Sequence, residues 1–300
     1  MEKKSEKERV HFVFHVLCWV FPTPARARFM LVALPIILCA FFVASCGGKA
    51  VNFELSSQDT EKLNLILEKL QVRYELTSTL KMQMRVTIED KGEKEEVREY
   101  LWYKKSETDG ELLHIQAMGP LNEPRVVVIA ARKQFLLRLI NENEAYFQPL
   151  EDGVLREIFG MDLRVSDVRN AIFANPFLDG NTDKLSLTHS GAKYVVTRPT
   201  VGGEQTEEIT IFVRNGEPKV QTWLVRNKDG TIIQRTKFSD YREVGGLLYP
   251  HKVEIERPLE QTRVVFKVVK PEINTAISDK KFDFERFLEE DTKIRRLPED

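Results

Sequence analysis

From Leu80 onward the sequence alternates apolar and polar side chains with a period of two residues. Successive side chains of a β-strand point to opposite faces of the sheet, so this period indicates a strand with one apolar and one hydrated face. The apolar positions are Leu80, Met82, Met84, Val86 and Ile88, and the polar positions are Lys81, Gln83, Arg85, Thr87 and Glu89.

Turn-forming pairs then recur at short intervals, as an antiparallel meander requires. They are Lys91-Gly92, Asp109-Gly110, Ser190-Gly191, Asn215-Gly216, Asp229-Gly230 and Gly245-Gly246. Strand-like runs between them cover residues 95–104, 111–118, 125–131, 134–140, 144–148, 184–189, 192–198, 207–214, 219–227, 231–242, 247–257 and 261–270. About a dozen antiparallel strands are too many for a flat open sheet. We therefore expect a mainly β fold, an incomplete and half-open antiparallel β-barrel over residues 59–274.

Helical spacing precedes the strands. Residues Ser56 to Asp59 offer N-cap side chains, and apolar positions follow at intervals of three and four. This pattern predicts an amphipathic helix of three to four turns with one apolar face, formed by Leu63, Ile66, Leu67 and Leu70.

Two further helical segments are expected later in the chain. Residues 151–174 predict two short helices between the two sets of strands, the second beginning near Ser166 and ending at Asn175-Pro176. We expect this pair to form a lid over the mouth of the barrel. A last helix is predicted from Asp279 to Leu288, within a C-terminal segment of residues 275–300 that ends in a charged tail.

The N-terminal region reads as an export signal. A charge-free apolar run covers residues 29–45 after two arginines, and the small residues Val43 to Ser45 precede Cys46. This arrangement resembles a bacterial lipobox, in which cleavage leaves the cysteine as a lipid-bearing N-terminus. The alternative is a short membrane anchor that happens to contain a cysteine.

The proposed signal is longer than usual. A second apolar segment covers residues 10–21, so either the true start lies further downstream or residues 1–45 form a signal peptide with an extended n-region. Residues 46–58 would then be the lipidated N-terminus and its linker. Gly47 and Gly48, in place of an acidic residue, favour the outer membrane as the destination.

Composition narrows the functional classes. All three cysteines lie within the first 46 residues, so the body after Cys46 has no disulfide and no thiol nucleophile. That body is near neutral, with a formal charge of −4 once the six basic and three acidic residues of 1–45 are removed, and it has no basic stripe that would indicate nucleic acid.

Enzyme motifs are also missing from the sequence. The body's three histidines, His114, His189 and His251, lack metal-ligand spacing, and no nucleophile elbow, phosphate loop or dinucleotide fingerprint is present. We therefore predict a protein that is not an enzyme and needs no cofactor or metal. A hydrolase on the same scaffold is the most distant alternative.

The order of these features resembles the family of LolA-like and LolB-like lipoprotein-localisation proteins over roughly residues 54–270. The strand and loop from Leu113 to Leu121 and the segment from Val154 to Phe177 carry most of the resemblance. It implies an unclosed barrel with a helical lid over an apolar cavity. The loop Gly119, Pro120, Leu121 matches the family's protruding leucine loop, although Asn122 stands where relatives tend to have glycine.

The resemblance implies an outer-membrane lipoprotein, facing the periplasm, that accepts lipoprotein or lipid acyl chains in an apolar cavity and inserts them into the membrane. Its partners would be those acyl chains, a LolA-like periplasmic carrier, and the membrane through the anchor on Cys46. The alternative is a scaffold or assembly lipoprotein that binds a protein partner and has a filled interior.

Candidate cavity residues come from the first strand, its neighbours and the lid, and each of them is equally open to interpretation as ordinary core. They are Leu80, Met82, Met84, Val86, Trp102, Val126, Val128, Phe135, Leu137, Leu155, Ile158, Phe159, Ile172 and Phe173. Methionine favours an adaptable pocket, because thioether side chains repack easily.

The lipobox interpretation generates a direct prediction. Replacing Cys46 with alanine is expected to yield uncleaved or soluble protein, because the cysteine thiol is the group that carries the lipid. Cell fractionation and the mass of the mature chain measure this outcome. A variant that matures and fractionates with the outer membrane unchanged would contradict the lipoprotein assignment.

Overall fold

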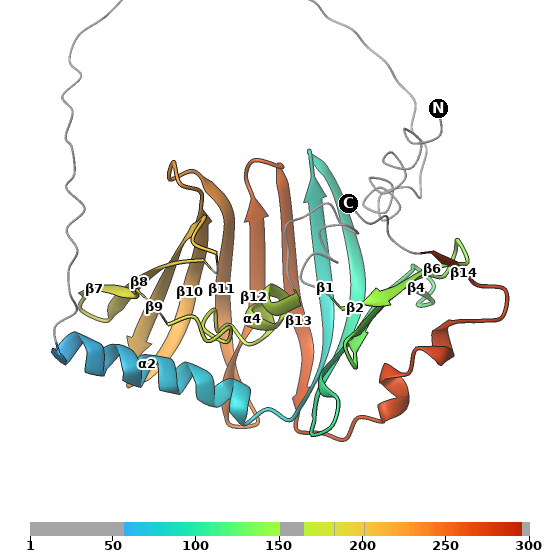
Figure 1. The fold of residues 1–300 in the computed structure, drawn as a ribbon, viewed down its shortest axis with the longest axis horizontal. Helices are drawn as coiled ribbons and strands as arrows, with labels where there is room; N and C mark the ends of the chain where they lie inside the picture. The colour runs from blue at the N-terminus through green and yellow to red at the C-terminus, as the bar shows by residue number, and fades with distance from the viewer. Residues whose placement is uncertain (1–56, 151–164, 183, 201, 296–300) are drawn as a thin grey trace, which may run out of the picture.

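The computed structural model describes residues 57–150, 165–182, 184–200 and 202–295, and within them one sheet of fourteen strands dominates (Figure 1). Strands β1 to β6 are Thr79–Asp90, Glu93–Ser106, Gly110–Met118, Pro124–Ala131, Gln134–Leu139 and Glu144–Pro149. Strands β7 to β14 are Ser186–Ser190, Lys193–Pro199, Thr206–Arg214, Glu217–Arg226, Ile232–Val244, Leu247–Arg257, Thr262–Ile273 and Lys293–Arg295. The helices are α2 (Ser57–Glu75) and α4 (Val165–Ile172), with 3-10 turns η1 (Asp279–Phe282) and η2 (Glu285–Phe287).

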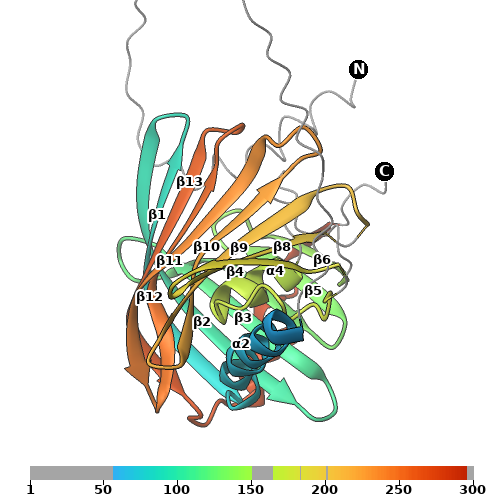
Figure 2. The same ribbon diagram turned by 90° about the vertical axis from the view of Figure 1, so that its left-hand side faces the viewer.

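The sheet consists of two antiparallel meanders. One comprises β1 to β6 and the other β7 to β13, and pairing of β1 with β13 joins them into the order β14-β6-β5-β4-β3-β2-β1-β13-β12-β11-β10-β9-β8-β7. The ends do not meet, so the sheet is strongly curved but open, which confirms the predicted half-open, mainly β fold (Figure 2). Strand β14 departs from the prediction, because it pairs with β6 in parallel.

Local turn chemistry explains the hairpins. Both residues of the β1–β2, β9–β10 and β11–β12 turns have positive φ, as two-residue hairpins with the twist of the sheet require. Glycine adopts this conformation at little cost and asparagine tolerates it. The turn pairs predicted from the sequence therefore lie at the ends of the strands that they join.

Helix α2 is longer than predicted, with 19 residues. Leu63, Ile66 and Leu70 are buried against strands of the second meander. The helix continues past this apolar face because its last turn is also used: Arg73 is buried and donates a hydrogen bond to the carbonyl oxygen of Phe173, 2.7 Å away. Arg73 is charged and therefore interrupts the apolar spacing from which the end of the helix was predicted. The predicted helix was too short for this reason.

Helix α4 corresponds to the second predicted lid helix, and the first one lies outside the described residues. The chain leaves the sheet after β6, next to one edge of the sheet, and re-enters it as β7 at the opposite edge. The described part of this connection begins with α4, which Figures 1 and 2 show on the concave side of the sheet. Arg169 of α4 is bonded to Glu111 of β3 at 3.2 Å, which ties the helix to the first meander.

The C-terminal segment was predicted to be a helix from Asp279 to Leu288, and this prediction is wrong. Two short 3-10 turns form instead, followed by β14 within the predicted charged tail. The segment lies along the outer face of the first meander, where Phe282 is fully buried among residues of β3 to β6. The conformation of this segment is set by the packing of its phenylalanine side chains onto the sheet, and the helical spacing of its apolar residues does not determine it.

Candidate functional site

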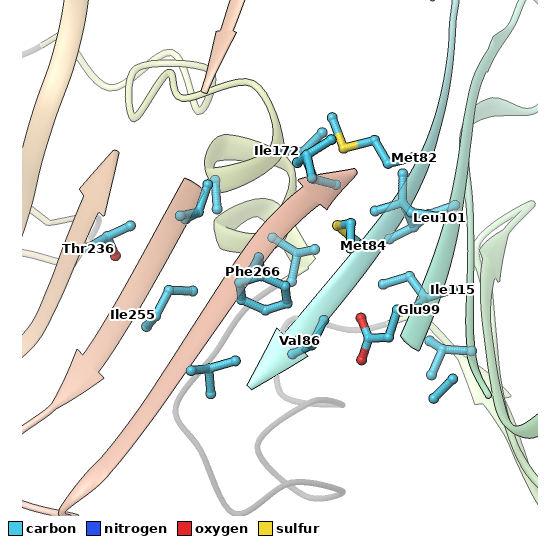
Figure 3. A pocket seen from close by; sticks show the side chains of 18 of the residues that line it. Met82, Met84, Val86, Glu99, Leu101, Ile115, Ile172, Thr236, Ile255 and Phe266 are labelled. Atoms are coloured by element: carbon cyan, nitrogen blue, oxygen red, sulfur yellow. The ribbon is translucent and has the colours of Figure 1, made fainter. Parts of the chain in front are cut away.

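An apolar pocket of about 290 Å³ lies on the concave side of the sheet, beneath α4. Figure 3 shows its side chains converging from several strands and from the helix. The volume is close to the lower limit of about 300 Å³ for small-molecule sites. Its walls are almost entirely apolar.

Strand alternation places the wall residues. On β1 the even-numbered residues Met82, Met84 and Val86 face the pocket, and on the neighbouring β2 the odd-numbered residues do so because Met82 pairs with Leu101 and Met84 with Glu99. The second meander contributes the opposite wall through Val264, Phe266 and Val268 of β13 and Val253 and Ile255 of β12. Helix α4 covers the space with Val168, Ala171 and Ile172.

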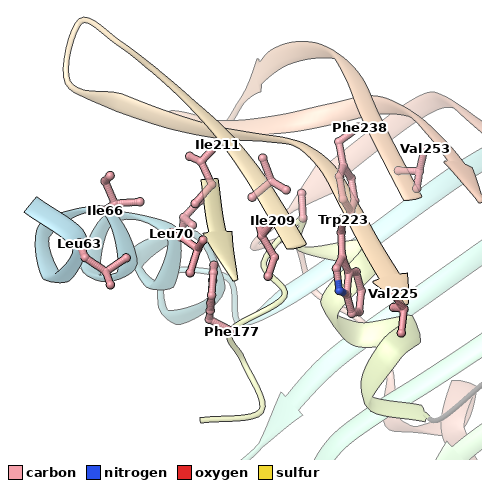
Figure 4. Packing of buried hydrophobic residues seen from close by; sticks show 13 residues of the cluster. Leu63, Ile66, Leu70, Phe177, Ile209, Ile211, Trp223, Val225, Phe238 and Val253 are labelled. Carbon is pink, nitrogen blue, oxygen red and sulfur yellow. The ribbon is translucent and has the colours of Figure 1, made fainter. Parts of the chain in front are cut away.

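The packed core continues directly from the pocket. Trp223 and Val253 belong both to the pocket wall and to the cluster in which α2 packs on the second meander (Figure 4). The pocket is therefore continuous with the packed core of the curved sheet.

All of the predicted cavity residues except Trp102 fall into three groups. Those that line the pocket are Met82, Met84, Val86, Val126, Val128, Phe135 and Ile172. Those buried in the packed core beside it are Leu80, Leu137 and Phe173. Those outside the described residues are Leu155, Ile158 and Phe159.

Trp102 was assigned to the wrong face. It follows Leu101, which lines the pocket, so its own side chain points to the outer face of the sheet. There its ring lies 4.8 Å from that of His114, and the Lys281 ammonium lies 4.1 Å from its centroid. The alternation of β2 gives a weak sequence signal because its concave face includes three glutamates as well as apolar residues.

Sequence reasoning missed the half of the wall formed by β12 and β13. Their alternating apolar residues are visible in the sequence, but nothing local indicates that β13 pairs with β1. It also missed the pocket's polar groups, which are Glu99 on β2 and Gln234 and Thr236 on β11.

Glu99 dominates the electrostatics of the pocket. The Glu99 side chain is half-buried. Its carboxyl group lies among protein atoms, and the part of the side chain that remains exposed borders the pocket. Burial is the one cause that acts on it, and it raises the pKa of Glu99 to about 7. Glu95, four residues earlier on the same face but outside the pocket wall, also has its pKa raised to about 7 by burial, against an opposing effect of Arg125.

The loop between β3 and β4 projects from the sheet. Leu121 at its tip is 90% exposed. A Cβ at Gly119 would lie 2.1 Å from a carboxylate oxygen of Glu123, so a larger residue there would require the side chain of Glu123 to move. Asn122 has φ 64°, a left-handed conformation that asparagine tolerates better than most residues other than glycine.

The histidines do not assemble a reactive site. His114 lies buried on the outer face of β3, and burial lowers its pKa to about 4. His251 is buried on β12, while His189 lies 3.7 Å from Asp59 near the far edge. Within the described ranges, no group of three or more possible metal-ligating side chains is found, and no helix is long and apolar enough to cross a membrane.

The raised pKa of Glu99 predicts how stability depends on pH. In an unfolded chain the carboxyl ionises near its ordinary pKa of 4.5, whereas in the folded protein it keeps its proton up to about pH 7. Between these values the folded state holds more protons, so stability falls as the pH rises. Glu99→Gln is therefore expected to raise the free energy of unfolding at pH 8, by up to about 3 kcal/mol, and to leave it unchanged at pH 4.

Urea unfolding of both proteins at several pH values measures this difference. Glu95 leaves a residual pH dependence in the variant. Parallel stability curves for the wild type and Glu99→Gln across this range would show that Glu99 is not held in an apolar site.

Comparisons with known proteins establish the fold. No protein-family model matches the sequence, and no curated protein matches it at a significant level.

A DUF1329 family protein from Desulfovibrio piger superposes with a TM-score of 0.57 at 15% identity, covering 76% of this chain and 98% of that chain. A putative outer membrane lipoprotein-sorting protein domain from Vibrio parahaemolyticus gives 0.54 at 10% identity, covering 74% and 98%. A LolA superfamily protein from Nitrosomonas europaea gives 0.48 at 10% identity, covering 74% and 98%. The chain therefore has the open, curved-sheet fold of the first two structures.

Proposed function

We propose that this protein carries the acyl chains of lipids or lipoproteins in the pocket between the curved sheet and α4. The observation that carries the proposal is the pocket itself, an apolar space of about 290 Å³ that is lined by both meanders and by the helix. The likeness of the fold to a lipoprotein-sorting domain supports the same ligand class.

The physical chemistry of acyl chains explains why such a pocket is useful. Each buried methylene contributes about 0.8 kcal/mol, so a C16 chain resists leaving a membrane by roughly 12 kcal/mol. Spontaneous transfer through water is correspondingly slow. A pocket that keeps the chain out of water lowers this barrier and needs no catalytic group.

We further propose that Cys46 anchors the chain in the outer membrane, facing the periplasm, and that a LolA-like periplasmic carrier delivers its cargo. The lipobox before Cys46 and the linker of residues 46–58 support this arrangement. The loop of Gly119, Pro120 and Leu121 would then act on the membrane during insertion. An exposed leucine at the tip of a tight loop is suited to this role, because it enters a bilayer at little cost.

A scaffold lipoprotein that binds a protein partner is the competing function. Such a protein needs no empty space inside its sheet, so its interior would be filled. The apolar pocket favours the carrier.

The first test fills the pocket. Ala171→Phe places a phenyl ring into the space from α4, and we expect at least a tenfold loss of affinity for N-phenyl-1-naphthylamine, an uncharged apolar fluorophore. Thermal stability should stay the same or rise, because the ring occupies empty volume. In a filled core the same substitution would cost about 1–3 kcal/mol through overpacking.

Ala192→Phe, in the turn before β8 and outside the pocket wall, is the matched control and should bind the fluorophore normally. Ala171→Phe with normal affinity, or with affinity and stability lost together, would argue against a ligand-binding pocket.

The second test concerns membrane insertion. Leu121→Glu should fold and accept a pyrene-labelled diacylglycerol normally, because the side chain is 90% exposed. Release of the lipid into liposomes should slow by at least tenfold, since a carboxylate resists entry into the bilayer. The rise of pyrene fluorescence in acceptor liposomes measures the rate.

Leu259→Glu is the control, because Leu259 is 64% exposed in the β12–β13 turn and has no proposed role. Equal release rates for Leu121→Glu and Leu259→Glu would remove the insertion loop from the mechanism and leave the carrier pocket intact.

A further inference from the structure

Glu99 is a single carboxyl group on an apolar surface. Its cross-strand neighbours are Met84 on β1 and Ala117 on β3, and the next residues on the same face of β2 are Val97 and Leu101. Figure 3 shows the carboxylate turned into the pocket beside Val86 and Ile115.

Within the part of the chain that the structure describes, no donor is bonded to this carboxylate. Arg98 points to the outer face and donates to Asn122, and Arg169 of α4 is bonded to Glu111. Across the pocket, the wall residues of β4, β5, β12 and β13 are all uncharged. On β3, His114 faces the opposite side of the sheet, and on the face of Glu99 the next titratable groups along β2 are Glu95 and Tyr103, each four residues away.

A half-buried carboxyl group on an apolar wall and without a donor costs free energy, whereas an apolar side chain at this position would complete the wall. A polar group retained in a pocket at such a cost is suited to act on a ligand. We therefore expect the polar head group of the ligand to supply the hydrogen-bond donor that Glu99 lacks.

We propose that Glu99 is the head-group site of the pocket and selects amphiphiles whose head donates hydrogen bonds, an ammonium or a hydroxyl, over amphiphiles with an anionic head. This inference rests on the proposed binding of acyl chains. A carboxylate forms short, charge-assisted hydrogen bonds to such donors. An ammonium also neutralises its charge, whereas a second carboxylate repels it in a site of low dielectric constant.

Three probes share the same alkyl chain and differ only in the head group: dodecylamine, dodecanol and dodecanoate. Each probe is titrated against N-phenyl-1-naphthylamine bound to the full mature protein, and the displacement of the fluorophore is measured. At pH 8, above the pKa of about 7 for Glu99, dodecylamine should displace the fluorophore at a concentration at least tenfold lower than dodecanoate, with dodecanol between them. In Glu99→Gln the amine and the carboxylate should differ by less than twofold.

Glu95→Gln is the matched control, because it removes one negative charge from the same strand and face but not from the pocket wall. It should keep the wild-type preference, which separates a local contact from attraction by the overall charge of the protein. A second readout needs no variant: lowering the pH from 8 to 5 protonates Glu99, so the preference of the wild type for dodecylamine over dodecanoate should disappear.

The outcomes distinguish this inference from the function on which it rests. If Glu99→Gln keeps the preference for dodecylamine, or Glu95→Gln loses it equally, then Glu99 is not the head-group site, although binding of the fluorophore still supports the carrier. If neither the fluorophore nor any of the three probes binds the wild type, the carrier function fails and the inference fails with it.

Discussion

Pairing of β1 with β13 is the interaction on which the rest of the structure depends. The two strands run antiparallel over eleven register pairs, from Leu80 opposite Ile273 to Asp90 opposite Thr262. Without this pairing the chain would be two separate meanders, each with an exposed edge and an apolar face. With it, the two apolar faces form one concave surface, and the pocket lies across the junction, with walls from both meanders. The strands lie far apart in the sequence, so the loop-closure entropy of bringing them together must be recovered from the apolar area that the junction buries.

This dependence explains how much of the fold the sequence predicted. Strands β1 to β13 and the six predicted glycine-containing turns follow from local signals, because a period of two and glycine at positive φ are properties of neighbouring residues. The junction has no local signal, and the wall contributed by Val264, Phe266 and Val268 was therefore missed. The same reasoning separates Leu101 from Trp102: one step along a strand reverses the face, so a wall residue is predictable only when the register is known. Strands β4 and β5 were recognisable as nearly continuous apolar runs because the C-terminal segment covers their outer face as well.

A buried ion cluster fixes the path of the chain after α4. The guanidinium of Arg198 on β8 is fully buried and is bonded to Glu207 of β9, to Asp179 and to the carbonyl oxygen of Pro176. Removing one partner of such a cluster costs about 3–5 kcal/mol, because the remaining charges stay buried. The cluster therefore holds the segment that follows α4 against the second meander. Arg73 of α2 and Arg169 of α4 add contacts to Phe173 and Glu111. Together these arginines tie α4 and the residues that follow it to α2 and to both meanders.

Two opposite solutions to burying charge thus occur in one sheet. Arg198 is buried together with its carboxylates, and this pairing makes the burial compatible with a stable fold. Glu99 is half-buried on the apolar pocket wall with no described donor, and the cost of desolvation appears in its pKa of about 7. Both residues point from strands toward the concave side, so the difference does not come from their place in the fold. The difference comes from what each side chain faces. Arg198 faces the packed segment that follows α4, and Glu99 faces the pocket. A lysine or arginine placed in the pocket to pair with Glu99 would itself lose its hydration when an apolar chain enters. Such a permanent cation is therefore unsuited to a pocket that holds an apolar chain. Leaving the carboxyl group unpaired in the empty protein is the arrangement in which a ligand's head group can complete it.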